Sequence, residues 1–232
     1  MPSKTITEFA VDSDRFAVLK ECTENYDVGT EKAEWPNNIV SRKAVLYASG
    51  VIARKGTKVR HAVESGELAL CKKLAAEAAR LMAGVEVGMG SESSDAFRGF
   101  FIAANVDDPV PKAITEELIR DRFGGTIFPL ATITVEPLKE AGKWWSEVKF
   151  DGSESGAAYF RPWRKMIQWF GKRPEFKRSA FIRIGDRQAL WTIPREKYPP
   201  GTELTGCVLP RMAVGLTAAG SLAGLFGYCV QT

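Results

Sequence analysis

The last 21 residues of the chain, MAVGLTAAGSLAGLFGYCVQT at positions 212–232, contain no charged side chain. Such a segment has to be shielded from water, and three arrangements achieve this. It could form two core strands, residues 212–217 and 222–230, with a turn at 218–221. It could instead be an arm that packs on a neighbouring subunit, or a helix that spans a membrane. Its four glycines dilute its hydrophobicity and are tolerated where strands bend, so we expect core strands, then an arm, and least of all a membrane helix.

The rest of the sequence divides into a helical first part and a strand-rich second part. Helical spacing and capping residues predict helices over residues 13–24, 41–55, 65–84 and 111–123. Runs of β-branched and aromatic residues predict strands over residues 97–106, 126–135, 144–150, 180–184, 189–193 and 204–209. Within them, residues 182–191 resemble a hairpin that turns near Gly185 and Asp186.

These elements predict an α+β fold. A helical N-terminal part would pack beside a β-rich C-terminal half, which could be an antiparallel sheet, a sandwich or a partly open barrel. The glycine- and serine-rich residues 85–96 mark a possible sub-boundary. We expect one continuous domain over residues 1–232, a length that is compatible with a single large core.

Cysteine and histidine are too scattered to predict a zinc site. The cysteines, at positions 22, 71, 207 and 229, form no CxxC pair, and His61 is the only histidine. A zinc site normally needs clustered ligands of these types, so we predict no metal and no cofactor. The N-terminus lacks the basic start and apolar run of a secretory signal, which predicts an intracellular, cytoplasmic protein with reduced thiols.

Positive charge is concentrated in residues 159–178, YFRPWRKMIQWFGKRPEFKR. This stretch contains seven Lys and Arg residues, six aromatic residues and one acid. The whole chain carries a net charge of only +4, so the remainder is slightly acidic. Such localised basicity favours a dedicated anionic partner over general adhesion to anions.

A short amphipathic helix is predicted over residues 163–170, because Pro162 suits a first turn and Gly171 suits the residue after a last turn. Its apolar stripe consists of Trp163, Met166, Ile167 and Phe170. The basic side chains of the stretch, with the one tryptophan off the stripe, are the candidate nucleic-acid-binding residues: Arg161, Arg164, Lys165, Trp169, Lys172, Arg173, Lys177 and Arg178. Cations neutralise backbone phosphates, and an aromatic ring beside them can stack on a base. The alternative is a surface helix with a solvated basic face.

The sequence contains no clear catalytic constellation. His61 lies between Arg60 and Ala62 in a basic segment, which is typical of a surface histidine, and no serine lies in a nucleophile-elbow motif. We therefore predict a non-enzymatic, nucleic-acid-binding structural protein. It would be a subunit of a repeated nucleoprotein assembly, such as a capsid or a guide-RNA complex, with RNA or single-stranded DNA and further subunits as its partners.

Two other classes of function are weighed against this hypothesis. A metal-dependent enzyme that acts on phosphate esters, such as a nuclease, could be assembled from Asp107, Asp108, Asp151 and Glu154. Adjacent acids in loops are more often solvated turn residues. A membrane-associated protein, with residues 212–232 as its anchor, is the third class, and we do not expect a membrane partner.

Overall fold

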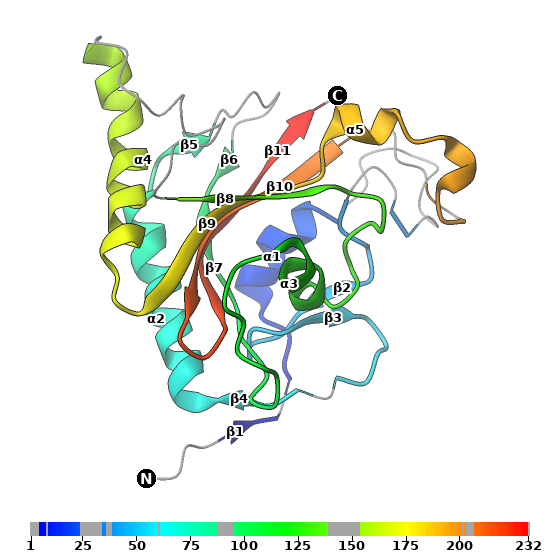
Figure 1. The fold of residues 1–232 in the computed structure, drawn as a ribbon, viewed down its shortest axis with the longest axis horizontal. Helices are drawn as coiled ribbons and strands as arrows, with labels where there is room; N and C mark the ends of the chain where they lie inside the picture. Colours follow the sequence, from blue (N-terminus) through cyan, green and yellow to red (C-terminus); the bar gives the residue numbers. More distant parts are fainter. Residues whose placement is uncertain are drawn as a thin grey trace.

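The computed structural model describes residues 5–7, 9–23, 34–35, 39–59, 61–87, 95–138, 154–200, 202 and 207–231. The largest sheet in this part of the chain has five antiparallel strands in the order β7–β11–β10–β9–β8 (Figure 1). From edge to edge these strands are Arg98–Ile102, Leu222–Gln231, Cys207–Thr217, Phe176–Ile184 and Ile133–Pro137. Helices pack against this sheet, and the predicted α+β class is confirmed.

The uncharged C-terminal segment forms β10 and β11, the two inner strands of the sheet. They pair with each other from Cys207↔Gln231 to Leu216↔Leu222, while β9 flanks β10 and β7 flanks β11. Residues 208–217 and 222–227 are all buried. The prediction of core strands is confirmed, and the arm and membrane-helix alternatives for this segment are wrong. In the described part of the chain, no helix is both long and apolar enough to cross a bilayer.

Layers of helices and loops cover both faces of the sheet. α2 (Ser65–Leu81) and α4 (Glu154–Lys172) lie on one face (Figure 1). α1 (Ser13–Glu21), α3 (Glu116–Arg122) and the hairpin of β2 (Ala44–Leu46) with β3 (Ile52–Arg54) contribute to the core on the other. Neighbouring residues of β11 reach both layers, because successive strand side chains point to opposite faces. Leu225 packs in a cluster with Met166 of α4, and Phe226 packs in a cluster with Leu19 of α1.

The remaining elements are short. β1 (Thr5–Ile6) pairs with β4 (Val63–Glu64), and β5 (Glu86–Val87) pairs with β6 (Asp95–Ala96). After β9 the chain forms α5 (Arg187–Trp191) and a 3₁₀ turn at Arg195–Lys197.

Two segments differ from their predicted structure. Residues 41–55, predicted as a helix, form the β2–β3 hairpin, in which Leu46 lies opposite Ile52 and Gly50 takes a φ of 84° in the turn. Residues 187–191, predicted as part of a strand and hairpin, form α5. The carboxylate of Asp186 caps this helix by accepting a hydrogen bond from the backbone N–H of Ala189 at 2.9 Å.

Other predicted elements are confirmed with changed boundaries. α2 follows the prediction, but it begins without a side-chain cap, and its buried face consists of Leu68, Cys71, Leu74, Ala75 and Ala78. α3 is shorter than the predicted helix, since Thr115 caps it by accepting from the N–H of Leu118 at 3.2 Å. The predicted strand over residues 144–150 lies outside the described residues.

Candidate nucleic-acid interface

α4 carries the basic stretch on a longer helix than the sequence predicts. The helix begins at Glu154, so Pro162 lies inside it, and it continues through Gly171. The predicted apolar stripe is confirmed at its centre, where Trp163, Met166 and Phe170 are buried against the sheet. One side of α4 therefore has to face the core.

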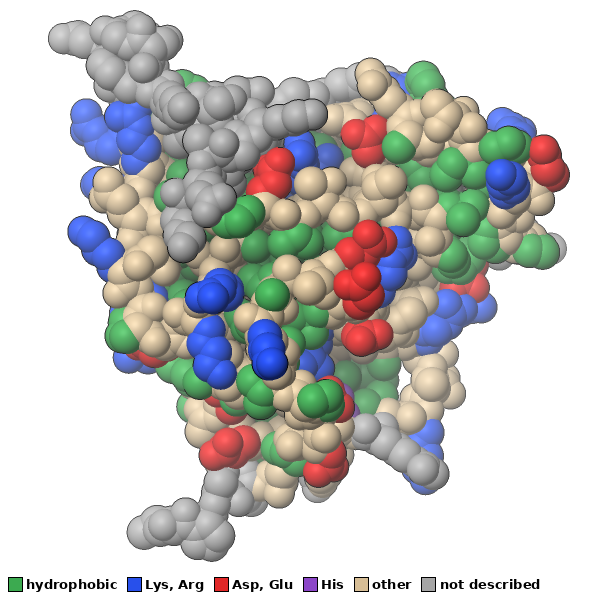
Figure 2. All heavy atoms as spheres, viewed as in Figure 1, with side chains coloured by type: hydrophobic (Ala, Val, Ile, Leu, Met, Phe, Trp, Pro, Cys, Tyr) green, Lys and Arg blue, Asp and Glu red, His purple; other side chains and the backbone are tan. Residues whose placement is uncertain are grey.

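The opposite side of α4 presents cations to solvent. Arg161, Lys165 and Lys172 are exposed, and their spacing of four and seven residues places them on one side of the helix. Arg164, at the margin, is half-buried. Figure 2 shows Lys and Arg side chains along the left edge of the molecule, where α4 runs in Figure 1.

A groove lies beside the C-terminal end of α4. It has a volume of about 560 Å³ and is bounded by Gly171 of α4, the start of β9 and residues 113–114 before α3. Arg173, Lys177 and Arg178 line it, and no carboxylate occurs among its described lining residues. A second hollow of about 410 Å³ shares Lys177 and Arg178 with this groove and is also lined by Lys112. Figure 2 shows Lys and Arg side chains grouped near the turn that joins β10 to β11.

Two exposed cations of this groove are held by backbone carbonyls. The Nζ of Lys177 donates to the carbonyl of Ala218, in the turn after β10, at 3.2 Å. The Nη1 of Arg178 donates to the carbonyl of Lys177 at 2.9 Å. Neither bond neutralises a charge, so both side chains remain full cations at the surface.

Arg173 and Trp169 are committed to packing as well as lining the basic surface. Arg173 forms an ion pair with Glu77 of α2, and its guanidinium lies 4.7 Å above the ring of Trp169. That ring is half-buried and contacts Phe170 and Phe176 edge to face, at centroid distances of 4.8 and 5.8 Å. Trp169 is therefore not the open stacking platform that the sequence suggests. Phe176, which lines the groove, is also half-buried, and its ring stacks on that of Phe170 at a centroid distance of 5.5 Å.

Sequence reasoning missed the most exposed large aromatic residue among the described ones. Trp191 of α5 is 61% exposed, and the guanidinium of Arg187 lies 3.8 Å from its ring centroid. The strand predicted over residues 189–193 does not include Arg187, so nothing in that prediction placed Arg187 beside Trp191. Their spacing of four residues on a helix does so.

The acidic alternative receives no support from Asp107 and Asp108. Asp107 is exposed, whereas Asp108 is paired with Arg122 at 2.9 Å. Burial alone would raise the pKa of Asp108, but the hydrogen bonds from Arg122 and Asn105 and the charge of Arg122 together lower it. Asp151 and the side chain of Glu154 lie outside the described residues. In the part that the structure describes, no group of three or more His, Cys, Asp or Glu side chains is arranged to hold a metal ion.

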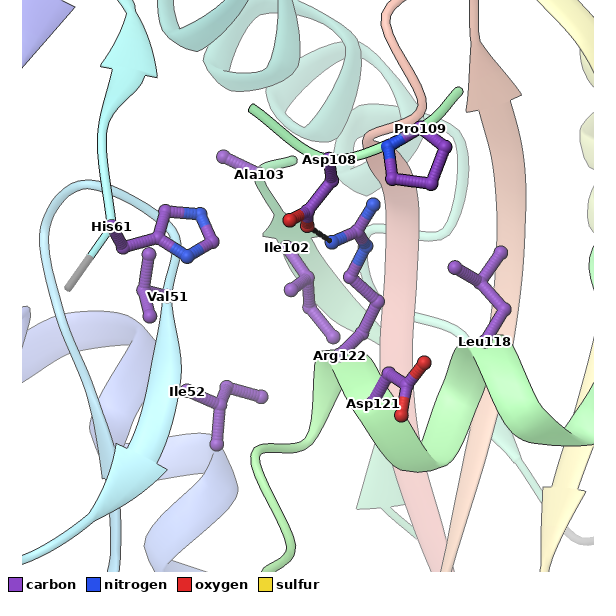
Figure 3. Close-up of a pocket in the computed structure, with 10 residues that line it drawn as sticks. All are labelled: Val51, Ile52, His61, Ile102, Ala103, Asp108, Pro109, Leu118, Asp121 and Arg122. Atoms are coloured by element: carbon purple, nitrogen blue, oxygen red, sulfur yellow. Dashed lines mark hydrogen bonds and ion pairs between the residues drawn. The ribbon is translucent and has the colours of Figure 1, made fainter. Parts of the chain in front are cut away.

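The histidine that the sequence assigns to the surface lines a pocket. His61 shares a hollow of about 380 Å³ with Asp108, Asp121 and Arg122 (Figure 3). Burial lowers the pKa of His61 below its ordinary value, and the charge of Arg122 adds to this. The pull of Asp108 and of backbone carbonyls at Ala103 and Ala104 opposes the shift without cancelling it. The ring is therefore neutral at physiological pH.

No protein-family model matches this sequence, and no curated protein is significantly similar to it.

Proposed function

We propose that the protein binds single-stranded nucleic acid, RNA or DNA, as a non-enzymatic structural component of a nucleoprotein particle. The observation that carries this proposal is the groove beside α4. Arg173, Lys177 and Arg178 line it without a carboxylate among its described lining residues, and Lys112 lies next to it; Arg173 is paired with Glu77 of α2, so Lys112, Lys177 and Arg178 are the cations that the described carboxylates leave uncompensated. A hollow lined by one sign of charge concentrates the electric field, and phosphate groups relieve the mutual repulsion of its cations.

The size of the groove favours a flexible strand. Its volume of about 560 Å³ lies in the range of small-ligand sites, so it accommodates a nucleotide-sized part of a strand rather than the side of a rigid duplex. Phe176 on its wall is half-buried and already stacks on Phe170 at a centroid distance of 5.5 Å, so the groove would hold the strand by its phosphates rather than by stacking on a base. Arg161, Lys165 and Lys172 extend the same charge along α4, in line with a strand longer than the groove.

Self-association stays a prediction. One sequence-based reason to expect it was that residues 212–232 could form an arm on a neighbouring subunit, but in the structure β10 and β11 pack within their own sheet. α5 offers a different surface, because Trp191 is exposed there and Arg187 stacks on it. Trp and Arg are enriched among the residues that dominate protein interfaces. We expect further subunits to contact this surface.

The binding proposal is tested by the double variant Lys177→Ala with Arg178→Ala. Affinity for a fluorescent nine-nucleotide oligo-U is measured over a series of salt concentrations. We expect weaker binding, with the slope of log K against log salt flattened by about 0.7 for each phosphate that the variant no longer neutralises. Both side chains are exposed, so thermal unfolding should remain close to that of the native chain.

Arg195→Ala with Lys197→Ala is the matched control. These two cations are also exposed, they lie in the 3₁₀ turn after α5, and their removal changes the net charge by the same amount. An unchanged salt slope in the control and a flattened slope in the groove variant support the proposal. Equal effects of the two variants, or no measurable oligonucleotide binding by the native chain, would overturn it.

A further inference from the structure

The pocket that contains His61 combines apolar walls with a few polar groups. Ile52 of β3, Ile102 at the end of β7 and Leu118 of α3 form apolar parts of its lining. His61 lies on one side and the Asp108–Arg122 pair on the other, with Asp121 beside them on α3 (Figure 3). Ligand pockets combine apolar contact with polar groups that orient the ligand, and in this pocket the polar groups supply at least as much of the lining as the apolar ones.

Two buried nitrogen atoms at this pocket lack a hydrogen-bond partner among the described residues. The side chain of Arg122 is only 7% exposed; its Nη1 donates to Asp108 at 2.9 Å and its Nη2 to the carbonyl of Gly220 at 3.3 Å. Its Nε makes no hydrogen bond within the described structure, and neither does the Nε2 of His61. Buried polar atoms are normally hydrogen-bonded, so these atoms point to a ligand that completes the site.

The charges of the pocket exclude a simple phosphate site. Asp108 and Asp121 supply two carboxylates, Arg122 supplies one cation, and His61 is neutral. A free anion would meet a net negative surface, and the guanidinium is already paired with Asp108. A neutral planar group that carries both N–H donors and a carbonyl acceptor satisfies these residues better.

The pocket and the basic groove are lined by consecutive residues of one segment of the chain. Asp108 and Pro109 line the pocket, and the next residues, 110–114, line the hollow and the groove that contain Lys177 and Arg178. The turn between β10 and β11 also joins them, since Ala218 accepts from Lys177 and Gly220 accepts from Arg122. A strand whose phosphates lie along the groove can therefore bring a neighbouring base to the pocket.

We propose that this pocket receives one unstacked base of the bound strand and that it prefers guanine. The inference rests on the proposed function and names the base that the site selects. Guanine presents two adjacent N–H donors, which match the two oxygens of the exposed carboxylate of Asp121, and its O6 can accept from the Nε–H of Arg122, whose two Nη atoms already donate to Asp108 and Gly220. Ile52 and Leu118 provide apolar contact for the ring, as in other sites that bind an extruded base.

The test uses five nine-nucleotide RNA strands of the form U₄XU₄, where X is G, A, C, U or an abasic residue. We expect the native chain to bind the G strand about tenfold more tightly than the U strand and the abasic strand. Asp121→Asn should reduce this ratio towards one. Asp107→Asn is the matched control, because it removes the same charge from an exposed neighbour that does not line the pocket, and it should keep the ratio.

The outcomes separate this inference from the proposed function. Equal affinity for the G and abasic strands, or an Asp121→Asn variant that keeps the preference, overturns the base pocket. In either case a salt slope that still depends on Lys177 and Arg178 leaves the groove proposal standing. A preference for A, C or U also overturns the assignment to guanine. If none of the strands binds, both proposals fail together.

Discussion

His61 is the only histidine of the chain, so the pH response of one side chain can be measured in isolation. Its pKa is lowered by burial in the folded state, whereas in the unfolded chain it returns to an ordinary value near 6.5. Between these two pKa values the unfolded state binds more protons than the folded state. The free energy of unfolding should therefore fall as the pH is lowered through about 6.5 and level off below the folded pKa.

The check is urea denaturation of the native chain and of His61→Gln at several pH values between about 5 and 7.5. We expect the native chain to lose stability towards the acidic end and the variant to show a flatter profile. The carboxyl groups of Asp12, Glu34 and Asp108 have lowered pKa values and titrate below this range. A variant that loses as much stability as the native chain would show that the response comes from another group.

The sequence could not have revealed the surroundings of this histidine. Asp108 and Arg122 are far from His61 along the chain, and the fold alone brings them to one pocket. Locally, His61 has a basic neighbour and no spacing motif, which is the pattern of a surface residue. The basic residues that line the groove were predictable, because Arg173, Lys177 and Arg178 lie within a few positions of one another.

At the scale of elements, the contact between α2 and β7 depends on the absence of one side chain. A Cβ added to Gly99 of β7 would lie 2.7 Å from the carbonyl oxygen of Ala75 and 3.3 Å from the Cβ of Ala79, both in α2. Backbone atoms of a packed helix cannot move aside cheaply. Gly99→Ala should therefore destabilise the fold by about 1–3 kcal/mol, measured by chemical denaturation.

Gly171→Ala is the control, and for it we expect no decrease in the free energy of unfolding. Gly171 lies inside α4, and nothing lies within 4 Å of an added Cβ. Since alanine favours a helix over glycine, this change should leave stability unchanged or raise it by up to about 1 kcal/mol. Equal destabilisation by the two variants would mean that α2 does not approach the sheet as closely as the structure shows.

Elements with a self-contained pattern were predictable, and those that depend on distant partners were not. Trp163, Met166 and Phe170 define the buried side of α4 by spacing alone. The start of the same helix was not predictable, because Pro162 resembles a first-turn residue and yet lies inside the helix. The helix predicted over residues 41–55 was wrong for another reason. Leu46 and Ile52 fit a helix as well as a hairpin, and only the pairing of the two strands decides between these structures.

At the scale of the whole molecule, the hairpin of β10 and β11 contributes side chains to the hydrophobic core on both faces of the sheet. The layers that cover the two faces therefore both depend on this hairpin. Leu225 belongs to the core beneath α4 and Phe226 to the core on the opposite face. Calorimetry should therefore show a single unfolding transition, in agreement with one continuous domain. Leu225→Ala should lower that one transition, with a decrease of about 2–5 kcal/mol in the free energy of unfolding. A second transition that stays at its original temperature would indicate two independent units.

Because ribosomes synthesise a chain from its N-terminus, the place of β10 and β11 in the sequence decides when they can join the sheet. β7, β8 and β9 are synthesised before β10 and β11, yet the later strands lie between β7 and β9 in the finished sheet. Until the hairpin is made, β8 and β9 can pair only with each other, β7 has no neighbouring strand of this sheet, and the apolar sides of α2 and α4 have no complete surface to cover. A nascent chain that has not yet reached β10 therefore exposes this apolar surface, and chaperones and aggregation compete for it. Insertion of the hairpin ends this competition, and its long-range pairing makes it a slow step.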